Sequence, residues 1–301
     1  MVQVSVIMPA YNASKTIEES ILSVMNQTFQ YWELIIVNDG SVDETLTIVE
    51  RLVKKDARLK LIDLKKNAGL PAARNQGVMQ ACGKYIAFLD SDDTWAAEKL
   101  KFQMDFHLKR PTYAISHTNY IDFNEKGIIK RPWKIIMEMF NSKEGHLLPE
   151  LYYKNVIGVL TVMVEKSVLE ELNGFDAGFW TLEDQDLWIR IAEKGYEFGY
   201  IPQKLAFYRV APGSMSRTIG RYKRSCKKLI SKHIAKISKD GNISNLVWGN
   251  YYRNIGTSYF KKANYPMAKR YFFKSIRLHG FRFISFTTVL YLMVNEIKQH
   301  L

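Results

Sequence analysis

The sequence predicts an α/β fold: a doubly wound, mainly parallel sheet with helices on both faces, followed by an all-helical C-terminal region. Two observations predict it. Over the first 110 residues, short β-branched and apolar runs alternate with stretches whose apolar residues recur at helical spacing. Strands spaced by helices of this length form βαβ units, so most of them pair in parallel. After residue 216 the pattern is helical throughout.

Four strands are expected in the first 110 residues. Each is an apolar run of strand length, bounded by polar or turn-forming residues. These runs cover residues 2–8, 34–37, 60–64 and 85–89.

Helices are expected between these strands. Ile17 begins the apolar face of the first helix, with Ser14 as its expected N-cap. Leu46 and Val49 mark the face of the second. The third is expected to start at Pro71, because the missing N–H of proline costs nothing at the first helical position.

The pattern is less regular from residue 111 to residue 216. The expected elements there are strands over 113–121 and 160–164, a loop over 126–134 and a helix over 186–194. We therefore expect two domains, an α/β domain over residues 1–216 and a helical extension over residues 217–301.

Charge divides the chain at the same boundary. The formal net charge of the whole chain is +13. Residues 1–216 hold 25 Lys and Arg against 28 Asp and Glu, a net charge of −3, whereas residues 217–301 hold 18 against 2, a net charge of +16. A basic excess confined to one segment predicts that this segment meets an anionic surface, either a membrane or a nucleic acid.

The sequence also indicates a compartment. Cys82 and Cys226 lie far apart and cannot form a disulfide framework or a zinc site, so a reducing cytoplasm is the default. The first residues lack the cationic leader of a signal peptide. The apolar segment 283–294 is shorter than the roughly 20 residues that cross a bilayer. We therefore expect a protein that is neither exported nor membrane-spanning.

Polar residues follow each of the four expected strands. In doubly wound sheets, ligands bind in the crevice beyond the carboxyl ends of the strands. The sequence therefore predicts that these residues line a ligand site. They are Tyr11 and Asn12, the run 38–41, Asn67, and the run 90–93.

Asp90, Asp92 and Asp93 place three carboxylates within four residues. Their mutual repulsion favours a divalent cation, because Mg²⁺ and Mn²⁺ prefer oxygen ligands and are often held by one or two carboxylates plus substrate phosphates. The alternative is a solvated loop in which Asp93 caps a helix that starts near Trp95. The run 38–41 likewise suits an ordinary turn. Taken singly, these motifs leave both alternatives open.

Taken together and in order, the motifs resemble the family 2 glycosyltransferases. The resemblance covers about residues 1–216, and its two aspartate motifs each follow an apolar strand, which is much harder to obtain by chance than either alone. The matching segments are residues 4–12, 27–29, 32–41, Ala73-Arg74-Asn75-x-Gly77, and residues 85–93, 174–176 and 182–188.

The resemblance implies a GT-A glycosyltransferase domain over residues 1–216 and a role for individual positions. Asp184 would be the catalytic base, and Asp92 would ligate Mn²⁺ or Mg²⁺ bridging the donor's phosphates. The other positions implied to bind the nucleotide sugar are Pro9, Tyr11 and Asp39 at the nucleoside, Asn67 and Arg74 over the nucleotide, Asp90 at the ribose, and Glu183.

Two observations qualify these roles. Without the resemblance, Glu183, Asp184 and Asp186 are equally well explained as acids that the helix dipole favours in a first turn, and Asp186 is expected to be structural. Ala211 stands where the family often has a histidine that approaches the metal or the diphosphate. The identity of the remaining metal ligands is therefore left open.

The activity implied is that of an inverting glycosyltransferase. It would move a sugar from a nucleotide-diphosphate sugar, with a UDP-sugar favoured, to a hydroxyl of a glycan or lipid-linked acceptor in bacterial cell-surface polysaccharide synthesis. One alternative is a nucleotidyltransferase on a related α/β scaffold, in which Glu183 and Asp184 would lack a role. The other is a non-catalytic nucleotide-sugar or glycan-binding protein, against which Asp92 and Asp184 argue.

The basic segment has two expected features. Residues 221–239 hold eight Lys or Arg in 19 residues and predict an amphipathic helix. This helix lies on an anionic membrane surface, packs its apolar stripe on the catalytic domain, or does both. Residues 252–272 carry the spacing of one tetratricopeptide-like helix pair. No nucleic-acid motif accompanies the charge. We therefore expect a cytoplasmic protein, peripheral on the inner face of the cell membrane, with no nucleic acid partner.

Overall fold

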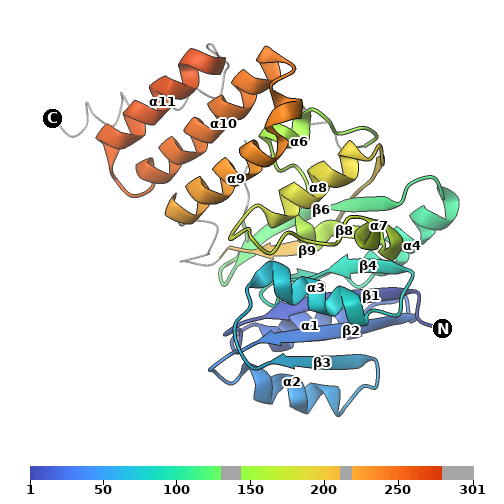
Figure 1. Cartoon of the computed structure of the whole chain (residues 1–301). Helices are drawn as coiled ribbons and strands as arrows, with labels where there is room; N and C mark the ends of the chain where they lie inside the picture. The colour runs from blue at the N-terminus through green and yellow to red at the C-terminus, as the bar shows by residue number, and fades with distance from the viewer. Residues whose placement is uncertain (130–143, 211–218, 280–301) are drawn as a thin grey trace. The chain divides into compact units, whose positions relative to one another are not determined.

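The computed structural model describes residues 1–129, 144–210 and 219–279, and the chain divides into two compact units (Figure 1). The first unit comprises residues 1–148 and 156–212, and the second comprises residues 149–155 and 213–301. The expected boundary at residue 216 falls outside the described residues, as do Ala211 and the apolar segment 283–294.

Four parallel strands form one half of the sheet of the first unit. In spatial order they are β3 (Leu59–Leu64), β2 (Trp32–Asp39), β1 (Val4–Ala10) and β4 (Tyr85–Phe88). Every residue of β1, β2 and β4 is buried. Strands that are covered on both faces need continuous apolar runs, which is why the sequence predicted them well.

The other half of the sheet is mixed. Its order continues through β8 (Val162–Glu165), β6 (Ile115–Asn124), β9 (Phe198–Arg209) and β5 (Thr94–Trp95), with β7 (Gly127–Ile128) paired to β6. β8 runs antiparallel to both of its neighbours, and β6 pairs with β9 in parallel. The predicted α/β class is therefore confirmed, with parallel pairing concentrated in the first half of the sheet.

Helices cover both faces of the parallel half. Side chains alternate between the two faces of a strand, so Val4, Val6 and Met8 share a face and cluster with α1 (Ile17–Met25). Ile7 points to the opposite face, where α3 (Leu70–Gln80) packs; a Cβ on Gly77 would lie 2.5 Å from Ile7 Cγ2. The remaining described helices of this unit are α2 (Thr45–Val53), α4 (Lys99–Lys109), η1 (Val159–Thr161), α7 (Lys166–Glu171) and α8 (Glu183–Glu193).

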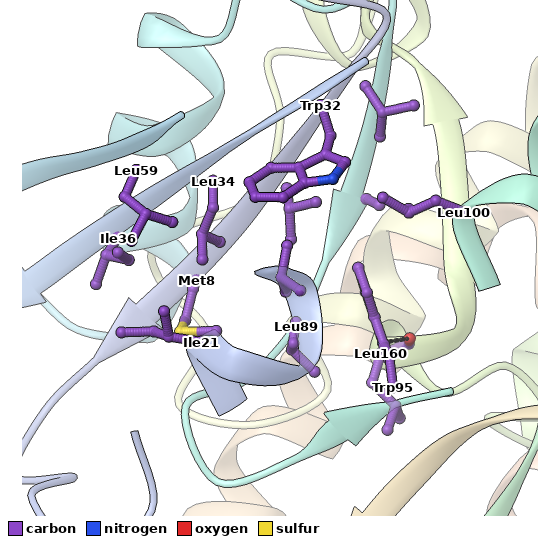
Figure 2. Packing of buried hydrophobic residues seen from close by; sticks show 14 of the residues in the cluster. Met8, Ile21, Trp32, Leu34, Ile36, Leu59, Leu89, Trp95, Leu100 and Leu160 are labelled. Carbon is purple, nitrogen blue, oxygen red and sulfur yellow. Dashed lines mark hydrogen bonds between the residues drawn. The ribbon is translucent and has the colours of Figure 1, made fainter. Parts of the chain in front are cut away.

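The core on the α1 side extends across the strand ends to the loops of the second half. Figure 2 shows part of it, in which the indole of Trp95 lies beside Leu160 and donates a 2.9 Å hydrogen bond from Nε1 to the Leu160 carbonyl oxygen. Because this bond satisfies the one polar atom of the indole, Trp95 is buried without cost. Trp95 thereby fixes the chain just beyond the aspartates of residues 90–93.

Two helix starts differ from the prediction. α1 begins at Ile17 after Thr16, and Ser14 caps no helix: its backbone N–H donates to Asp43 Oδ2 at 3.1 Å. α4 begins at Lys99, because Thr94 and Trp95 pair with β9 as a short strand. Asp93 therefore caps no helix either. The cap at Ser14 was predicted, and a loop contact with Asp43 replaces it. The cap at Asp93 was the alternative interpretation of the aspartate run, and pairing of the next residues with β9 rules it out.

The second unit is helical. Its described elements are α6 (Glu150–Tyr153), α9 (Ile219–Ile237), α10 (Gly241–Phe260) and α11 (Tyr265–His279). α10 and α11 form the expected single helix pair, in which a Cβ on Gly256 would lie 2.9 Å from the ring of Phe272. Asp240 caps α10 by accepting from the backbone of Asn242 and Ile243.

The apolar stripe of α9 is buried within the protein. Cys226, Leu229, Ile230 and Ile237 are all buried, and the ring of His233 lies 6.2 Å from that of Tyr152 in α6. The stripe therefore packs within the second unit, to which α6 also belongs, and this leaves the cationic face of α9 for other contacts. No helix in residues 1–129, 144–210 and 219–279 is both long and apolar enough to cross a membrane.

Candidate active site

The loops after β1 and β2 are joined by reciprocal hydrogen bonds. The Asn12 backbone N–H donates to Ser41 Oγ at 3.0 Å, and the Val42 N–H donates to Asn12 Oδ1 at 2.9 Å. Asp43 accepts from Ser14 and from Thr45. These hydrogen bonds hold the loop after β1 against the loop after β2 at the carboxyl ends of the two strands.

Asp39 at the end of β2 contacts Asn67 in the loop after β3. The carboxylate of Asp39 accepts from the backbone N–H groups of Ala68 at 2.6 Å and Gly69 at 3.0 Å, and Asn67 Nδ2 donates to the Asp39 carbonyl oxygen at 3.2 Å. Gly40 has a φ of 69°, and a Cβ there would lie 2.8 Å from the Asn67 backbone nitrogen. A glycine is therefore required for the loop of Asn67 to close against Asp39.

Arg74 connects two of the predicted motifs. Its Nη2 donates to Asp90 Oδ1 at 2.7 Å, and its Nη1 donates to Glu183 Oε1 at 2.6 Å. Arg74 is 1% exposed. Burial works against its charge, but the two carboxylates outweigh this and raise the pKa of the guanidinium. The ring of Phe175 lies 5.3 Å from the Arg74 Cζ.

The other residues of the Ala73-Arg74-Asn75-x-Gly77 motif hold this arginine in place. Asn75 donates to the Phe175 carbonyl oxygen at 2.8 Å and accepts from the Phe175 N–H at 2.9 Å. Gly174 has a φ of 62°, and a Cβ there would lie 2.5 Å from Asn75 Oδ1. The motif therefore docks α3 on β1 at one end and on the loop before α8 at the other.

The aspartates after β4 lie in three different environments. Asp90 is held by Arg74. Asp93 is buried; its Oδ1 accepts from the Arg209 backbone N–H at 2.7 Å, and its Oδ2 has no hydrogen-bond partner among the residues described. Burial, followed by the charges of Asp92 and Asp90, raises the pKa of Asp93. Asp92 keeps an exposed surface, but desolvation and the charge of Asp90 raise its pKa to about 6.

Arg209 fixes this loop, and the sequence interpretation missed it. Its Nε donates to the Asp92 carbonyl oxygen at 2.7 Å, its guanidinium pairs with Glu19, and its Cζ lies 4.4 Å from the ring centroid of Phe123. The sequence signal was the segment 208–216, from which only the departure at Ala211 was noted. The role of Arg209 is evident only in the fold, in which β9 places this residue beside the aspartates of residues 90–93.

Asp92 is the carboxylate of this loop that is left for a divalent cation. Asp90 pairs with Arg74, and Asp93 is buried, with one of its two oxygens bonded to the backbone of Arg209. No group of three or more potential His, Cys, Asp or Glu ligands gathers within the described parts of the chain. The donor set therefore fits a cation held by one carboxylate together with the phosphates of its substrate, as Mg²⁺ commonly is.

The Glu183–Asp184 pair starts α8. Leu182 precedes it with a φ of 67°, a left-handed conformation that is strained for a bulky residue and is typical of functional sites. Glu183 is buried against Arg74, whereas Asp184 is half-buried and accepts from the Gln185 N–H at 2.7 Å. Asp186 is fully buried and pairs with Arg190 at 2.8 Å, which is the structural role expected of it.

The structure thus joins five of the predicted positions into two groups, Asp39 with Asn67, and Asp90 with Arg74 and Glu183. Asp92 and Asp184 are sequence neighbours of the second group. Pro9 is buried in β1 opposite Val37, and Tyr11 follows it with 50% of its surface exposed. Within the described part of the chain, no hydrogen bond or ion pair joins Pro9 or Tyr11 to either group.

Two family models match the chain. The model described as glycosyl transferase family 2 matches residues 5–170, and one described as the N-terminal domain of galactosyltransferase matches residues 140–212. The second match includes the Glu183–Asp184 pair.

Curated relatives match about 70% of the chain. The putative teichuronic acid biosynthesis glycosyltransferase TuaG of Bacillus subtilis is 33% identical over 213 residues, 71% of this chain and 81% of that protein. The UDP-Glc:alpha-D-GlcNAc-diphosphoundecaprenol beta-1,3-glucosyltransferase WfgD of Escherichia coli is 36% identical over 220 residues, 71% of this chain and 79% of that protein. An uncharacterized glycosyltransferase of Rickettsia conorii is 37% identical, but the match spans only 33% of its length.

Solved structures share the fold at lower sequence identity. TarS 1–349 of S. aureus in complex with UDP-GlcNAc has a TM-score of 0.60 at 20% identity, covering 92% of this chain and 89% of that chain. The mannosyltransferase PcManGT of Pyrobaculum calidifontis in complex with GDP-Man and Mn²⁺ has a TM-score of 0.63 at 19% identity, covering 98% and 80%. The match to the family model over more than half of the chain, together with relatives such as TuaG at 33% identity, establishes that the chain belongs to the family 2 glycosyltransferases.

Proposed function

We propose that this chain transfers a sugar from a nucleotide-diphosphate sugar, with a UDP-sugar favoured, to a hydroxyl of a glycan or lipid-linked acceptor, inverting the anomeric centre. The observation that carries this proposal is Arg74, which holds Asp90 and Glu183 at 2.7 and 2.6 Å and so unites the strand-end aspartates with the Glu183–Asp184 pair. The activities named for TuaG and WfgD support a place in cell-surface polysaccharide assembly.

Asp184 is the general base in this proposal. A sugar hydroxyl is a poor nucleophile, so a positioned carboxylate accepts its proton as the bond to the anomeric carbon forms; such assistance is worth ~10²–10⁴-fold. Asp184 suits this role because it is half-buried at the first turn of α8. The neighbouring acid that pairs with Arg74 is Glu183. Displacement from the face opposite the diphosphate gives inversion without a covalent enzyme intermediate.

On the donor side, Asp39 and Asn67 bind the nucleoside, next to Pro9 and Tyr11, and Asp90 binds the ribose. Arg74 acts as a positioning residue, because with 1% of its surface exposed it reaches the donor through the two carboxylates that it holds. This differs from the direct contact with the nucleotide that the resemblance implied for it.

Asp92 holds a divalent cation, Mn²⁺ or Mg²⁺, together with the diphosphate of the donor. When bound, such an ion supplies a Lewis acid that neutralises charge on the departing nucleoside diphosphate. The Mn²⁺ in the PcManGT complex supports this choice. Arg209 orients Asp92 through its backbone carbonyl oxygen.

A panel of nucleotide sugars tests the proposal. Release of nucleoside diphosphate from one of them is expected to require Mn²⁺ or Mg²⁺, to stop when a chelator is added, and to fall about 10²–10⁴-fold in Asp184→Asn while donor binding survives. Asp105→Asn, an exposed aspartate on α4, is the matched control and should retain full activity. Full activity of Asp184→Asn would reject the base. Turnover of NTPs without sugar transfer would favour the nucleotidyltransferase alternative, and donor binding without turnover a binding protein.

We also propose that the cationic face of residues 217–301 places the enzyme on the inner face of the cell membrane. The support is the net charge of +16 and the buried apolar stripe of α9, which leaves exposed cations such as Arg224 and Lys239 available. Changing both to Gln is expected to shift the protein from the membrane fraction to the soluble fraction at low salt. Unchanged partitioning would reject the membrane contact.

A further inference from the structure

The three helices of the second unit bring one lysine and two tyrosines to a single point. Lys223 of α9 donates from Nζ to Tyr259 Oη of α10 and to Tyr271 Oη of α11, both at 3.2 Å. The two rings are stacked, with centroids 5.6 Å apart and an interplanar angle of 14°. All three residues are partly exposed, so the cluster is open to solvent.

This cluster has more hydrogen-bond donors than acceptors. An ammonium group carries three N–H donors, and each phenol carries one O–H. Two of the ammonium hydrogens go to the phenol oxygens, which leaves one N–H and two O–H groups that have no acceptor among residues 1–129, 144–210 and 219–279. Three donors therefore converge around the hydroxyl ends of two parallel rings.

The charge at this point is also unbalanced. Lys223 forms no ion pair within the described part of the chain, and residues 217–301 contain only Asp240 and Glu296 as acids. A second cation, Lys274 of α11, lies 5.8 Å from the centroid of Tyr271. The phenol oxygens hold the pKa of Lys223 above its usual value, although desolvation acts against this. The ammonium group is therefore charged at neutral pH.

We propose that Lys223, Tyr259 and Tyr271 form a binding site for a phosphate group. Three convergent donors around one positive charge match the three peripheral oxygens of a phosphate monoester better than the two oxygens of a carboxylate. The phosphate comes either from a lipid whose headgroup is a phosphate monoester, such as phosphatidic acid, or from a soluble phosphate monoester. Phosphate binding at this site does not depend on sugar transfer. It is also distinct from general attraction by net charge, because it requires three particular side chains in a defined geometry.

Binding of glycerol phosphate to the full chain tests the site. Titration calorimetry in metal-free buffer avoids the proposed cation site, and the same measurement in Asp184→Asn should give an unchanged result. The double variant Tyr259→Phe/Tyr271→Phe keeps the ring stack but removes both phenol donors. It is expected to weaken binding about tenfold or more, since hydrogen bonds to a charged group contribute about 1.5–3 kcal/mol. Lys223→Gln should do the same.

Lys227→Gln is the matched control, because this exposed lysine lies one turn further along α9 and its loss changes the net charge equally. It is expected to change the affinity less than twofold. Equal effects of Lys227→Gln and Lys223→Gln, or an unchanged affinity in the tyrosine double variant, would overturn the site. Thermal unfolding checks that each variant is folded, and Tyr271→Phe alone replaces the double variant if that one is not.

Vesicles distinguish the source of the phosphate. The variants are compared for binding to vesicles that contain phosphatidic acid, a phosphate monoester, and to vesicles that contain phosphatidylglycerol, a phosphate diester, at matched salt. Loss of phosphatidic acid binding in the tyrosine variants, with phosphatidylglycerol binding unchanged, assigns the site to a lipid headgroup. A loss that is confined to glycerol phosphate supports the site and assigns it to a soluble ester.

Discussion

Arg74 donates hydrogen bonds to Asp90 and to Glu183, which lies 109 residues further along the chain. Its Nε has no hydrogen-bond partner among the described residues. The two carboxylates therefore supply all the side-chain interactions that offset the free-energy cost of burying its charge. A buried ion pair contributes little net stability when intact, but removal of one partner leaves an uncompensated charge. At the scale of single residues, the ion pairs of Arg74 with Asp90 and Glu183 therefore affect both the free energy of unfolding and the positions of the site residues.

Arg74→Met is expected to lower the free energy of unfolding by about 3–5 kcal/mol and to abolish transfer, because Asp90 and Glu183 lose their shared partner. Urea unfolding at pH 7 measures the first effect, and product formation measures the second. Arg51→Met is the control: Arg51 and Glu18 form an exposed pair, so its loss should cost less than about 1 kcal/mol. Equal costs for the two variants would contradict the bridge.

Arg209→Gln is expected to raise the Mn²⁺ concentration needed for half-maximal activity, while the maximal rate at saturating Mn²⁺ changes less. The physical reason is that Arg209 orients the backbone of Asp92 through a 2.7 Å bond and holds the loop next to Glu19. Mn²⁺ titrations of the activity, and of Mn²⁺ binding in the presence of nucleoside diphosphate, measure the effect. Glu19→Gln removes only the outer pair and should shift the titration less.

Asp43 supplies a prediction for acid pH. Burial raises its pKa, but hydrogen bonds from Thr45 and Ser14 outweigh this and lower the pKa to about 2. In the unfolded chain an aspartate titrates near 3.9. Asp43 therefore contributes stability that is complete above about pH 4 and is lost as the pH falls toward 2. The free energy of unfolding of Asp43→Asn should be lower at pH 7 and less pH-dependent between 4 and 2 than that of the unchanged protein.

At the scale of elements, the site is built from the ends of strands that the turns hold in one register. The turn after β2 shows how strict this is, because Gly40 combines a positive φ with a close approach to the loop of Asn67. The motif on α3 works in the same way, since Gly77 lets the helix approach β1 while Arg74 points to the aspartates. Small residues at these positions bring polar residues from separate elements together.

Gly40→Ala is expected to destabilise the protein by several kcal/mol and to weaken donor binding, because a Cβ would lie 2.8 and 2.9 Å from the backbone of Asn67 and Lys66. Gly127→Ala is the matched control. It shares a positive φ of 106° but has nothing within 4 Å of the added Cβ, so it should show only the conformational cost of about 1 kcal/mol. Thermal unfolding and nucleotide titration measure both. Similar losses in the two variants would contradict the steric argument.

At the scale of the whole molecule, two units carry different charge and different chemistry. The proposed active site lies entirely in the first unit, and the proposed phosphate site lies entirely in the second. The second unit nevertheless has its own core, in which Phe272, Ala268 and the stripe of α9 are buried. Its stability can therefore be measured separately through a residue that lies only there.

Cys226 provides that measurement. Burial raises the pKa of its thiol to about 12, so the reactive thiolate is nearly absent while the second unit is folded. Cys82, the other cysteine, is exposed. A thiol reagent is expected to modify Cys82 quickly in the native protein and Cys226 only as denaturant unfolds the second unit. Mass spectrometry of the labelled peptides measures both rates, and rapid labelling of Cys226 in native buffer would contradict the packing of α9.

The sequence by itself determined the family, the α/β class and the four strands of the parallel half, of which β1, β2 and β4 are buried throughout. These are local signals, because a strand covered on both faces must be a continuous apolar run and the motifs follow the strand ends directly. The short or irregular elements were different. β5 and β9 are set by pairing with distant residues. A contact with Asp43 replaces the cap expected at Ser14, and a contact with Arg209 replaces the alternative of a cap at Asp93.

Only the tertiary structure decided how the site residues are connected. Nothing local to Arg74 indicates that it spans Asp90 and Glu183, and nothing local to Arg209 indicates that it holds the aspartate loop. The same is true of Lys223, whose two phenol partners come from different helices. Contacts of this kind depend on the distance and direction of side chains from separate elements, and the order of residues along one chain does not specify either.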